Sequence, residues 1–402
     1  MRSLLISGEY PPMRGGVADY TSLLATGLQR LGVDVTVLTS TRAASGSRPA
    51  ADSVAATVRS WGTGLWRDVA DQVARVHPDV IHIQYQTGAF GMQLGVNLLP
   101  WINRLRAGNP PVVVTFHDLK VPFLTPKIGP VRHLATVALA AASAAVVVTN
   151  PEDFDRVAGR PSSDRTRLYW GRRKVVATPI GSNIPPLAAD FDRARVRERI
   201  GARPDEFLIA FFGFVVPSKG LDPLCDAFET LVERGRPVRL MMVGAAAGDS
   251  GHPDRPYEGS IRRRLDAPSV RGRVTWTGFL HPADVASYLS ASDICCLPFR
   301  DGVSLRHGTL IAAIELGLPI VTTNGPGAIP HDRFPKLVPD RNVVLLPPGG
   351  VNQLTEAIDR LIVDQDFRRL LASGSRELAG AFGWDAISAD TLRLYEDLRR
   401  RA

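Results

Sequence analysis

Arg306 stands just before a predicted helix start whose residues are typical of an anion site. It precedes Gly308 and Thr309, where an apolar run predicts that a helix begins. The start of a helix offers unpaired backbone N–H groups and a partial positive charge, so phosphate binds well there. Arg306 could equally be a surface cation, and Thr309 an ordinary helix cap. The stretch Phe299–Pro319 is the first candidate for a phosphate site.

Lys219 offers a second positive charge, in a turn after another predicted strand. It precedes Gly220 in the segment GFVVPSKGLD. An ammonium group on a flexible stem neutralises a phosphate as a point charge. The alternative is an exposed loop lysine without a ligand. If both turns lie at one edge of a sheet, Lys219 and Arg306 converge on a single anion.

His117 and a pair of glycines mark the ends of two strands nearer the N-terminus. His117 closes the apolar run VVVTFH, where it could bind a substrate hydroxyl or carbonyl, or be a capped core histidine. Gly15 and Gly16 fall between the first predicted strand and a helix, so the backbone there could approach a phosphate closely. A tight turn would show the same pair. The GxGxxG spacing of dinucleotide-binding loops is absent.

Two further glycines end strands in the second half of the chain. Gly244 follows VRLMMV, and Gly278 follows VTWT and precedes Phe279 and Leu280. A glycine at such a point lets the flat ring of a base lie against the backbone, although routine turns also use glycine. These residues are candidates for binding a nucleotide.

The composition limits the remaining possibilities. A chain of 402 residues predicts two domains, and 45% apolar with 22% charged residues is typical of an ordinary globular protein. The formal net charge of +8 could favour anionic substrates, lipids or nucleic acids, but no nucleic-acid-binding module is recognisable. No histidine or cysteine has a partner at metal-ligand spacing, and neither a GxSxG elbow nor a P-loop lysine motif occurs. We therefore expect no metal site and no nucleic-acid partner.

The cysteines and the N-terminus favour the cytoplasm. Cys295 and Cys296 are adjacent in a predicted buried strand, so they point to opposite faces and cannot readily pair. Reduced core thiols fit a cytoplasmic protein. The segment MRSLLISGEYPP has too short an apolar part for a signal peptide and is interpreted as a first strand. The alanine-rich stretch His133–Val148 favours a helix that runs into a strand over a membrane span.

Apolar strands alternate with helices along both halves of the chain. Strands that are apolar throughout predict parallel sheets covered by helices on both faces. The predicted strands are RSLLISG, VDVTVLT, DVIHIQY, PVVVTFH, AAVVVTN and KVVATPI in the first half, and FLIAFFGF, VRLMMVG, RVTWTGF, DICCLPF and LPIVTTN in the second. The segment 185–206 is a linker or boundary helix. The predicted fold class is α/β with two doubly wound, Rossmann-like domains, whose sites lie beyond the carboxyl ends of the strands.

The chain resembles the GT-B glycosyltransferases of family 4 over essentially its whole length. The segments that carry the resemblance are EYPPMRGGVADYTSLLATGLQRLGVDVTVLT, DVIHIQYQTGAFG, VVVTFHD, PIGSNIP, GFVVPSKGLDPLCDAF, VTWTGFL, DICCLPFRDG and LIAAIELGLPIVTT. The resemblance implies an acceptor-binding domain over residues 1–190 and a nucleotide-sugar-binding domain over 191–380. It also implies a C-terminal helix over 381–402 that crosses back to the first domain.

Matching motifs imply roles for individual residues. Gly15 and Gly16 match the glycine loop that approaches the donor diphosphate, and His117 matches the histidine that contacts the transferred sugar. Lys219 matches the lysine on the diphosphate. One departure is that Phe214 stands where the family usually has an arginine.

A second departure concerns the two glutamates of the family, which hold the donor sugar and the ribose. They would fall on Ser304 and Ala312, and neither residue is acidic. Asp301 could take the sugar-binding role, and Arg306 could replace the missing arginine. Glu315 lies one helical turn from position 312 and could serve as a substitute carboxylate.

The resemblance implies transfer of a sugar from a nucleotide-diphosphate sugar, such as a UDP- or GDP-sugar, to a small-molecule or lipid-linked acceptor. Transfer with retention of configuration, without a metal or other cofactor, is the form implied. One alternative is a pseudoglycosyltransferase or a sugar-phosphate synthase-like coupling enzyme. Another is a non-catalytic GT-B paralogue that binds a nucleotide, which the missing glutamates favour.

The segment LKVPFLTPKIGPVRHL bears on the acceptor because it combines basic and apolar residues. It could touch an anionic membrane that carries a lipid-linked acceptor. It could instead be a mobile acceptor loop on a soluble enzyme. We expect a cytoplasmic protein, with at most a weak peripheral contact at the inner face of the membrane.

Overall fold

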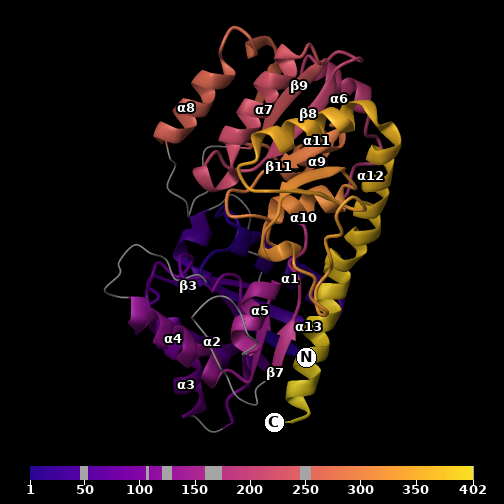
Figure 1. Ribbon diagram of the computed structural model, residues 1–402. Helices are drawn as coiled ribbons and strands as arrows, with labels where there is room; N and C mark the ends of the chain where they lie inside the picture. The colour runs from indigo at the N-terminus through magenta and orange to yellow at the C-terminus, as the bar shows by residue number, and fades with distance from the viewer. Residues whose placement is uncertain (46–52, 106–107, 120–128, 159–173, 245–254, 402) are drawn as a thin grey trace. The chain divides into compact units, whose positions relative to one another are not determined.

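The chain folds into two compact units, seen in a computed structural model that describes residues 1–45, 53–105, 108–119, 129–158, 174–244 and 255–401 (Figure 1). Unit 1 comprises Met1–Gly181 together with Trp384–Ala402, and unit 2 comprises Ser182–Gly383. The sequence placed the boundaries at 190 and 380, whereas the structure divides the chain at 181 and 383.

Unit 1 is built on a parallel sheet of seven strands in the order β3-β2-β1-β4-β5-β6-β7. The strands are β1 (Arg2–Ser7), β2 (Asp34–Ser40), β3 (Val54–Val58), β4 (Val80–Tyr85), β5 (Val112–Phe116), β6 (Ala145–Val148) and β7 (Lys174–Ala177). The helices are α1 (Gly16–Arg30), α2 (Leu65–Val76), α3 (Gly95–Arg104), α4 (Gly129–Ala142), α5 (Pro151–Ala158) and α13 (Trp384–Arg399). The strand order reverses between β1 and β4, and such a switch point is where ligands bind in open α/β sheets.

Unit 2 repeats this plan with six parallel strands in the order β10-β9-β8-β11-β12-β13. The strands are β8 (Phe207–Phe212), β9 (Val238–Val243), β10 (Val274–Gly278), β11 (Ile294–Leu297), β12 (Ile320–Thr323) and β13 (Val344–Leu346). The helices are α6 (Arg193–Arg199), α7 (Leu221–Glu233), α8 (Arg255–Leu265), α9 (Pro282–Ser290), α10 (Gly308–Glu315), α11 (Val351–Val363) and α12 (Gln365–Ala379). Its switch point lies between β8 and β11.

The predicted fold class is therefore confirmed. Each strand that the sequence predicted is present, because runs of Val, Ile and Leu bury both faces of a parallel strand. The sequence did not single out β3, which lies at a sheet edge, or β13, which has three residues. The three cysteines are buried and free, as expected of core thiols.

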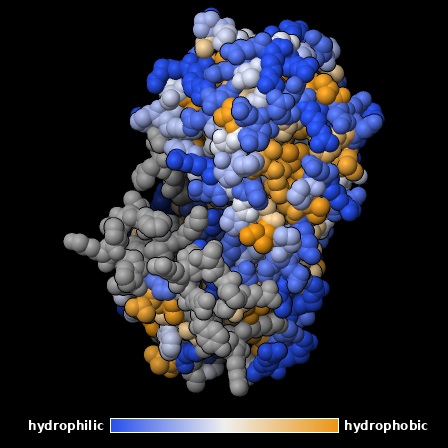
Figure 2. Space-filling model, viewed as in Figure 1, coloured by the Kyte–Doolittle hydropathy of each residue, from blue (hydrophilic) through white to orange (hydrophobic). Residues whose placement is uncertain are grey.

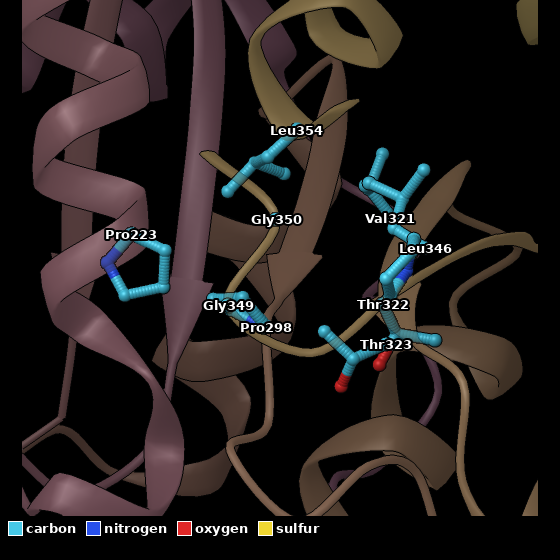
Figure 3. Close-up of a pocket in the computed structure, with 10 residues that line it drawn as sticks. Pro223, Pro298, Val321, Thr322, Thr323, Leu346, Gly349, Gly350 and Leu354 are labelled. Carbon is cyan, nitrogen blue, oxygen red and sulfur yellow. The ribbon is translucent and has the colours of Figure 1, made fainter. Parts of the chain in front are cut away.

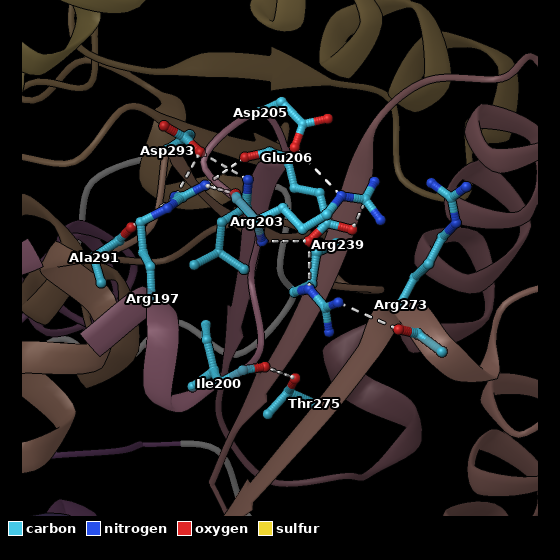
Figure 4. Close-up of polar contacts among 12 residues, drawn as sticks. Arg197, Ile200, Arg203, Asp205, Glu206, Arg239, Arg273, Thr275, Ala291 and Asp293 are labelled. Carbon is cyan, nitrogen blue, oxygen red and sulfur yellow. Dashed lines mark hydrogen bonds and ion pairs between the residues drawn. The ribbon is translucent and has the colours of Figure 1, made fainter. Parts of the chain in front are cut away.

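A network of ion pairs fixes the edge of the unit 2 sheet at which the strands begin (Figure 4). Arg197 of α6 contacts the carboxylate of Asp293, which also accepts a hydrogen bond from the backbone N–H of Leu208 at 2.7 Å. Arg239 donates to the carboxylate of Glu206 at 2.8 Å. Burial raises the pKa of Glu206, but hydrogen bonds and charges from Arg239 and Arg203 outweigh it and hold the pKa below its usual value. These ion pairs hold the strands in position at the amino-end edge of the sheet, away from the carboxyl ends of the strands.

The C-terminal helix α13 is anchored in unit 1 by a buried hydrogen-bonded chain. The Tyr395 hydroxyl lies 2.6 Å from Nδ1 of His82, and Nε2 of His82 lies 2.7 Å from the Thr115 hydroxyl. His82 is 1% exposed and Tyr395 is 1% exposed. Trp384, at the start of α13, packs edge-on against Tyr20 of α1. The return of the chain to unit 1 therefore buries polar groups that must stay paired.

Tyr395→Phe should destabilise the protein by about 1–3 kcal/mol, because it leaves a buried imidazole nitrogen of His82 without its partner. Urea unfolding followed by circular dichroism would measure the change. The matched control is Tyr257→Phe, which removes an exposed hydrogen bond to Asp222 and should cost less than about 0.5 kcal/mol. Equal effects of the two substitutions would show that the His82 contact does not anchor α13.

Candidate functional site

Phe299 is the buried platform of the candidate site in unit 2. It follows β11 and is 2% exposed. The ammonium nitrogen of Lys219 lies 4.9 Å from the centre of its ring, and the His307 ring lies 3.9 Å away, centre to centre. An ammonium over an aromatic face is held by the ring quadrupole. Phe299 therefore contacts both Lys219 and His307, the residue that precedes α10.

Gly213 brings Lys219 next to the start of α10. A Cβ built on Gly213, whose φ is +151°, would lie 3.7 Å from Cγ2 of Thr309 and 3.8 Å from Cε of Lys219. Thr309 is the second residue of α10, so the lysine stem and the helix start flank the same glycine. Lys219 and Thr309 therefore lie close to each other, whereas the convergence of Lys219 and Arg306 on one anion stays a prediction.

Gly213, Gly244 and Gly278 form a row at the carboxyl ends of β8, β9 and β10. A Cβ at Gly244 would overlap the carbonyl oxygen of Gly213, and Gly244 forms an isolated bridge with Gly278. Gly244 and Gly278 have φ values of +128° and +66°, which favour glycine. Phe279 follows with 54% of its surface exposed, and Leu280 is half-buried. A Cβ at Gly278 would meet nothing within 4 Å, so the backbone is open at that end of the row.

The loop before α10 is held in shape by its own backbone. The Ser304 N–H donates to Nδ1 of His307 at 3.2 Å, and the His307 N–H donates to the carbonyl of Ser304 at 3.0 Å. Gly302, with φ +80°, packs so closely against the backbone of Asn324 that a Cβ would overlap it. Arg306 is carried by this loop and is half-buried. The loop thus presents the arginine and the first N–H groups of α10 from one rigid turn.

The pKa of Lys219 is lowered in a way that an anion bound beside it would reverse. Burial lowers the pKa of Lys219 to about 8, and the positive charge of Arg306 contributes further. The repulsion between the positive charges of Lys219 and Arg306 destabilises the charged form of Lys219. An anion placed beside them relieves that cost.

Two predicted carboxylates are placed differently from the cations. Asp301 is exposed at the tip of the β11–α10 loop. Glu315 is the last residue of α10, about 10 Å along the helix axis from Gly308 at 1.5 Å per residue. Burial raises the pKa of Glu315. Ala312, where the family resemblance would place a glutamate, lies three residues before Glu315 in the same helix, so the role of Glu315 as a substitute carboxylate stays a prediction.

The candidate residues of unit 1 gather where β1, β4 and β5 end. Gly15 is the residue before α1, and a Cβ there would overlap the carboxylate of Glu9, whereas a Cβ at Gly16 would meet nothing within 4 Å. His117 follows β5, and its Nε2 lies 3.0 Å from Oε1 of Gln84. Its ring also meets the ring of Tyr20, from α1, edge-on at 4.6 Å between centres. Tyr20 thus joins the glycine loop and His117 into one arrangement.

His117 is held neutral. Burial lowers its pKa to about 3, because the charged imidazolium is disfavoured away from water. At neutral pH it therefore acts as a hydrogen-bonding group and not as a cation.

A small cavity in unit 2 is a separate feature from these groups (Figure 3). It lies among Pro223 at the start of α7, Leu346 of β13 and Leu354 of α11, and holds about 10 Å³. Ligand pockets are usually 300–1,000 Å³. It has room for about one water molecule, so it is no candidate for the nucleotide site.

Sequence reasoning missed the residues that support the candidates. Gln84, Tyr20 and Phe299 were not assigned roles, because a buried amide or aromatic residue has no distinctive spacing. The strand-end position of Gln84 was the one available signal. Among the described residues, no group of three or more His, Cys, Asp or Glu side chains could hold a metal ion. The segment 119–134 lies mostly outside the described residues, so its predicted contacts stay untested.

Family models match both units of the chain. The model "Glycosyl transferase 4-like domain" matches residues 15–181, and the model "Glycosyl transferases group 1" matches residues 206–364. Together they cover most of the sequence. The chain is therefore a glycosyltransferase with the GT-B fold, and it resembles family 4, as the sequence predicted.

Individual relatives agree with this assignment. A D-inositol 3-phosphate glycosyltransferase from Jonesia denitrificans is 27% identical over 72% of this chain and 67% of its own length. A GDP-mannose-dependent alpha-(1-6)-phosphatidylinositol monomannoside mannosyltransferase from Mycobacterium tuberculosis is 24% identical over 48% of each chain. The match thus spans from about half to two thirds of the length of these relatives. The structure of a sucrose-phosphate synthase from Thermosynechococcus elongatus has the same fold, with a TM-score of 0.77, 20% identity and full coverage of both chains.

Replacing Arg306 by glutamine should raise the pKa of Lys219 above about 8, because the repelling charge is removed while burial remains. The rate of acetylation of each lysine across a pH series, followed by mass spectrometry of peptides, measures this change. Exposed Lys336 serves as the internal reference. An unchanged titration of Lys219 in the variant would mean that the two side chains do not interact.

Proposed function

We propose that this glycosyltransferase binds the diphosphate of its nucleotide-sugar donor in unit 2, at Lys219, Arg306 and the start of α10. The observation that carries the proposal is the position of the Lys219 ammonium, held over the Phe299 ring beside the start of α10. Burial, and secondly the charge of Arg306, lower the pKa of Lys219 there. Such a pair is stabilised by a ligand with two negative groups. Arg306 would supply the charge that the family usually places at the position of Phe214.

The reaction we propose is transfer of the sugar with retention of configuration. The leaving diphosphate accepts the proton of the acceptor hydroxyl on the face from which it departs, so no base is required behind the sugar. Catalysis then depends on positioning and on stabilising the developing negative charge of the diphosphate. Lys219, Arg306 and the N–H groups of Gly308 and Thr309 supply that stabilisation, so we propose that the protein needs no metal or other cofactor.

The sugar end of the donor is assigned to unit 1. We propose that the neutral imidazole of His117 contacts a hydroxyl of the transferred sugar, and that the backbone at Gly16 approaches the diphosphate. A Cβ at Gly16 would meet open space, which supports access of a ligand to this backbone. The donor base is proposed to lie against the backbone of Gly244 and Gly278. A UDP- or GDP-sugar fits this scheme equally, since none of these contacts selects a base.

The acceptor is proposed to be a small molecule or a lipid-linked one, and the named relatives act on inositol phosphate and phosphatidylinositol mannoside. No helix among the described residues is long and apolar enough to span a bilayer. We propose a cytoplasmic protein that touches the membrane peripherally through α3 and α4. Apolar side chains gather over these helices (Figure 2), where Trp101, Leu105 and Leu134 are 47%, 85% and 65% exposed. Exposed Arg104 beside them suits an anionic lipid surface.

A thermal-shift panel of UDP, GDP, ADP and TDP tests the donor site, since a bound ligand raises the melting temperature. We expect at least one nucleotide to bind, and Lys219→Ala and Arg306→Ala each to weaken it about tenfold or more, which is about 1.4 kcal/mol. Affinity should fall as the pH rises through about 8, because Lys219 then loses its proton.

The control is Arg300→Ala, which removes an exposed arginine of the same loop and should leave the affinity within about threefold. Equal affinity of the wild type and of both site variants would refute the proposed diphosphate site. Binding without transfer from any sugar donor to any acceptor would favour the non-catalytic alternative.

Leu105→Ser should weaken sedimentation with vesicles that contain about one third phosphatidylglycerol, because it removes apolar area that would enter the interface. The control is Leu370→Ser, which changes a leucine of α12 that is 51% exposed. Failure of the wild-type protein to bind these vesicles at low salt would rule out the peripheral contact.

A further inference from the structure

Gln84 is a buried amide whose geometry is unusual for a core residue. It is the fifth residue of β4, it is 0% exposed, and it is paired in register with Ser7 of β1 and Thr115 of β5. Its Oε1 lies 3.0 Å from Nε2 of His117. Its own Nε2 is buried without a hydrogen-bond partner among the described residues. Leaving Nε2 of a buried amide unpaired costs about 1–3 kcal/mol. Stability alone therefore does not explain a glutamine at position 84, and its contact with His117 suggests a functional reason.

The contact between Gln84 and His117 selects one tautomer. An amide oxygen only accepts, so it pairs with His117 when the proton is on Nε2. A neutral imidazole carries one proton, which leaves Nδ1 as an acceptor. Within the described part of the chain, Nδ1 of His117 makes no hydrogen bond. The His117 ring is therefore oriented by the hydrogen bond of Nε2 to Gln84, and its Nδ1 can accept a hydrogen bond from a ligand.

We propose that Gln84 is a positioning residue that fixes His117 in the Nε2–H tautomer, so that Nδ1 accepts a hydrogen bond from a hydroxyl of the transferred sugar. This inference rests on the proposed function, in which His117 contacts that sugar. It adds the direction of the hydrogen bond, because the sugar hydroxyl donates and the protein accepts. It also assigns a role to Gln84, for which the family resemblance implied none.

The surroundings of the ring support a single orientation. Tyr20 of α1 meets the ring edge-on at 4.6 Å, which limits rotation away from Gln84. His82 lies two residues before Gln84 on the same face of β4, and its pKa is lowered to about 3 by burial and, secondly, by His117. Both nitrogens of His82 are occupied by Tyr395 and Thr115. His82 therefore offers no competing partner to the His117 ring.

Gln84→Met tests the inference because it keeps the volume of the side chain and removes the accepting oxygen. Nitrogen NMR of histidine-labelled protein distinguishes protonated from unprotonated ring nitrogens. We expect His117 of the wild type to show a protonated Nε2 and an unprotonated Nδ1, and the variant to show a mixture of tautomers. This measurement needs no substrate, so it stands even if the proposed transferase reaction fails.

Gln84→Glu supplies the opposite change, since it keeps an accepting oxygen at the same place and adds a charge. The carboxylate should retain the proton on Nε2 and raise the pKa of His117. The matched control is Tyr85→Phe, which removes a buried hydrogen bond to Asn97 from the neighbouring residue of β4. It should lower stability without changing the nitrogen signals of His117.

Kinetics separate positioning from a purely structural role. With a donor identified, Gln84→Met should lower kcat about tenfold or more, with partial rescue in Gln84→Glu, while the affinity for the nucleotide diphosphate stays within about twofold. Unchanged nitrogen signals of His117 in Gln84→Met would overturn the inference. The inference would also be overturned if Gln84→Met lowered kcat and nucleotide affinity equally, and both only in proportion to its loss of stability.

Discussion

The burial of the Lys219 ammonium, with a second positive charge at Arg306, is the constraint on which the candidate donor site depends. A cation that is partly removed from water is unfavourable, and a second cation nearby makes it more so. The fold maintains this arrangement by holding the Lys219 ammonium over Phe299 and by fixing the loop before α10. A diphosphate bound at the proposed site would relieve this cost. Such a site would gain affinity from preorganisation, since its side chains are already held in place.

Charged residues have different surroundings at the two edges of the unit 2 sheet. At the edge where strands begin, Arg197 and Arg239 are paired with carboxylates and bind the connecting segments together. At the carboxyl edge, Gly213, Gly244 and Gly278 end three neighbouring strands, and Lys219 and the start of α10 flank Gly213. A parallel sheet favours this division, because its helices all begin near one edge and direct their positive ends there.

Much of this could be predicted from the sequence, and the reasons differ by residue. The strands followed from continuous Val and Ile runs, and the start of α10 at Gly308 followed from the change to an apolar helical pattern. Lys219 and the helix start could be paired because parallel strands share an edge. The supporting contacts could not be predicted, since nothing in the residue types places Gln84 against His117 or Phe299 under Lys219. The role of Glu315 as a substitute carboxylate stays a prediction, because sequence spacing fixes a helix face but not what the side chain binds.

The loss of carboxylates at Ser304 and Ala312 changes where specificity must reside. Both side chains are buried, at 2% and 0% exposure, and neither supplies an ionised acceptor for sugar or ribose hydroxyls. In the proposed site, the contacts of unit 2 to the diphosphate and through backbone groups do not distinguish one sugar from another, which leaves Asp301 as the predicted carboxylate for the sugar there. Discrimination between sugars requires a fixed acceptor or donor elsewhere, because an unpaired polar group penalises the wrong hydroxyl pattern far more than a lost methylene does. We propose that the neutral acceptor at Nδ1 of His117, oriented by Gln84, is such a group in unit 1.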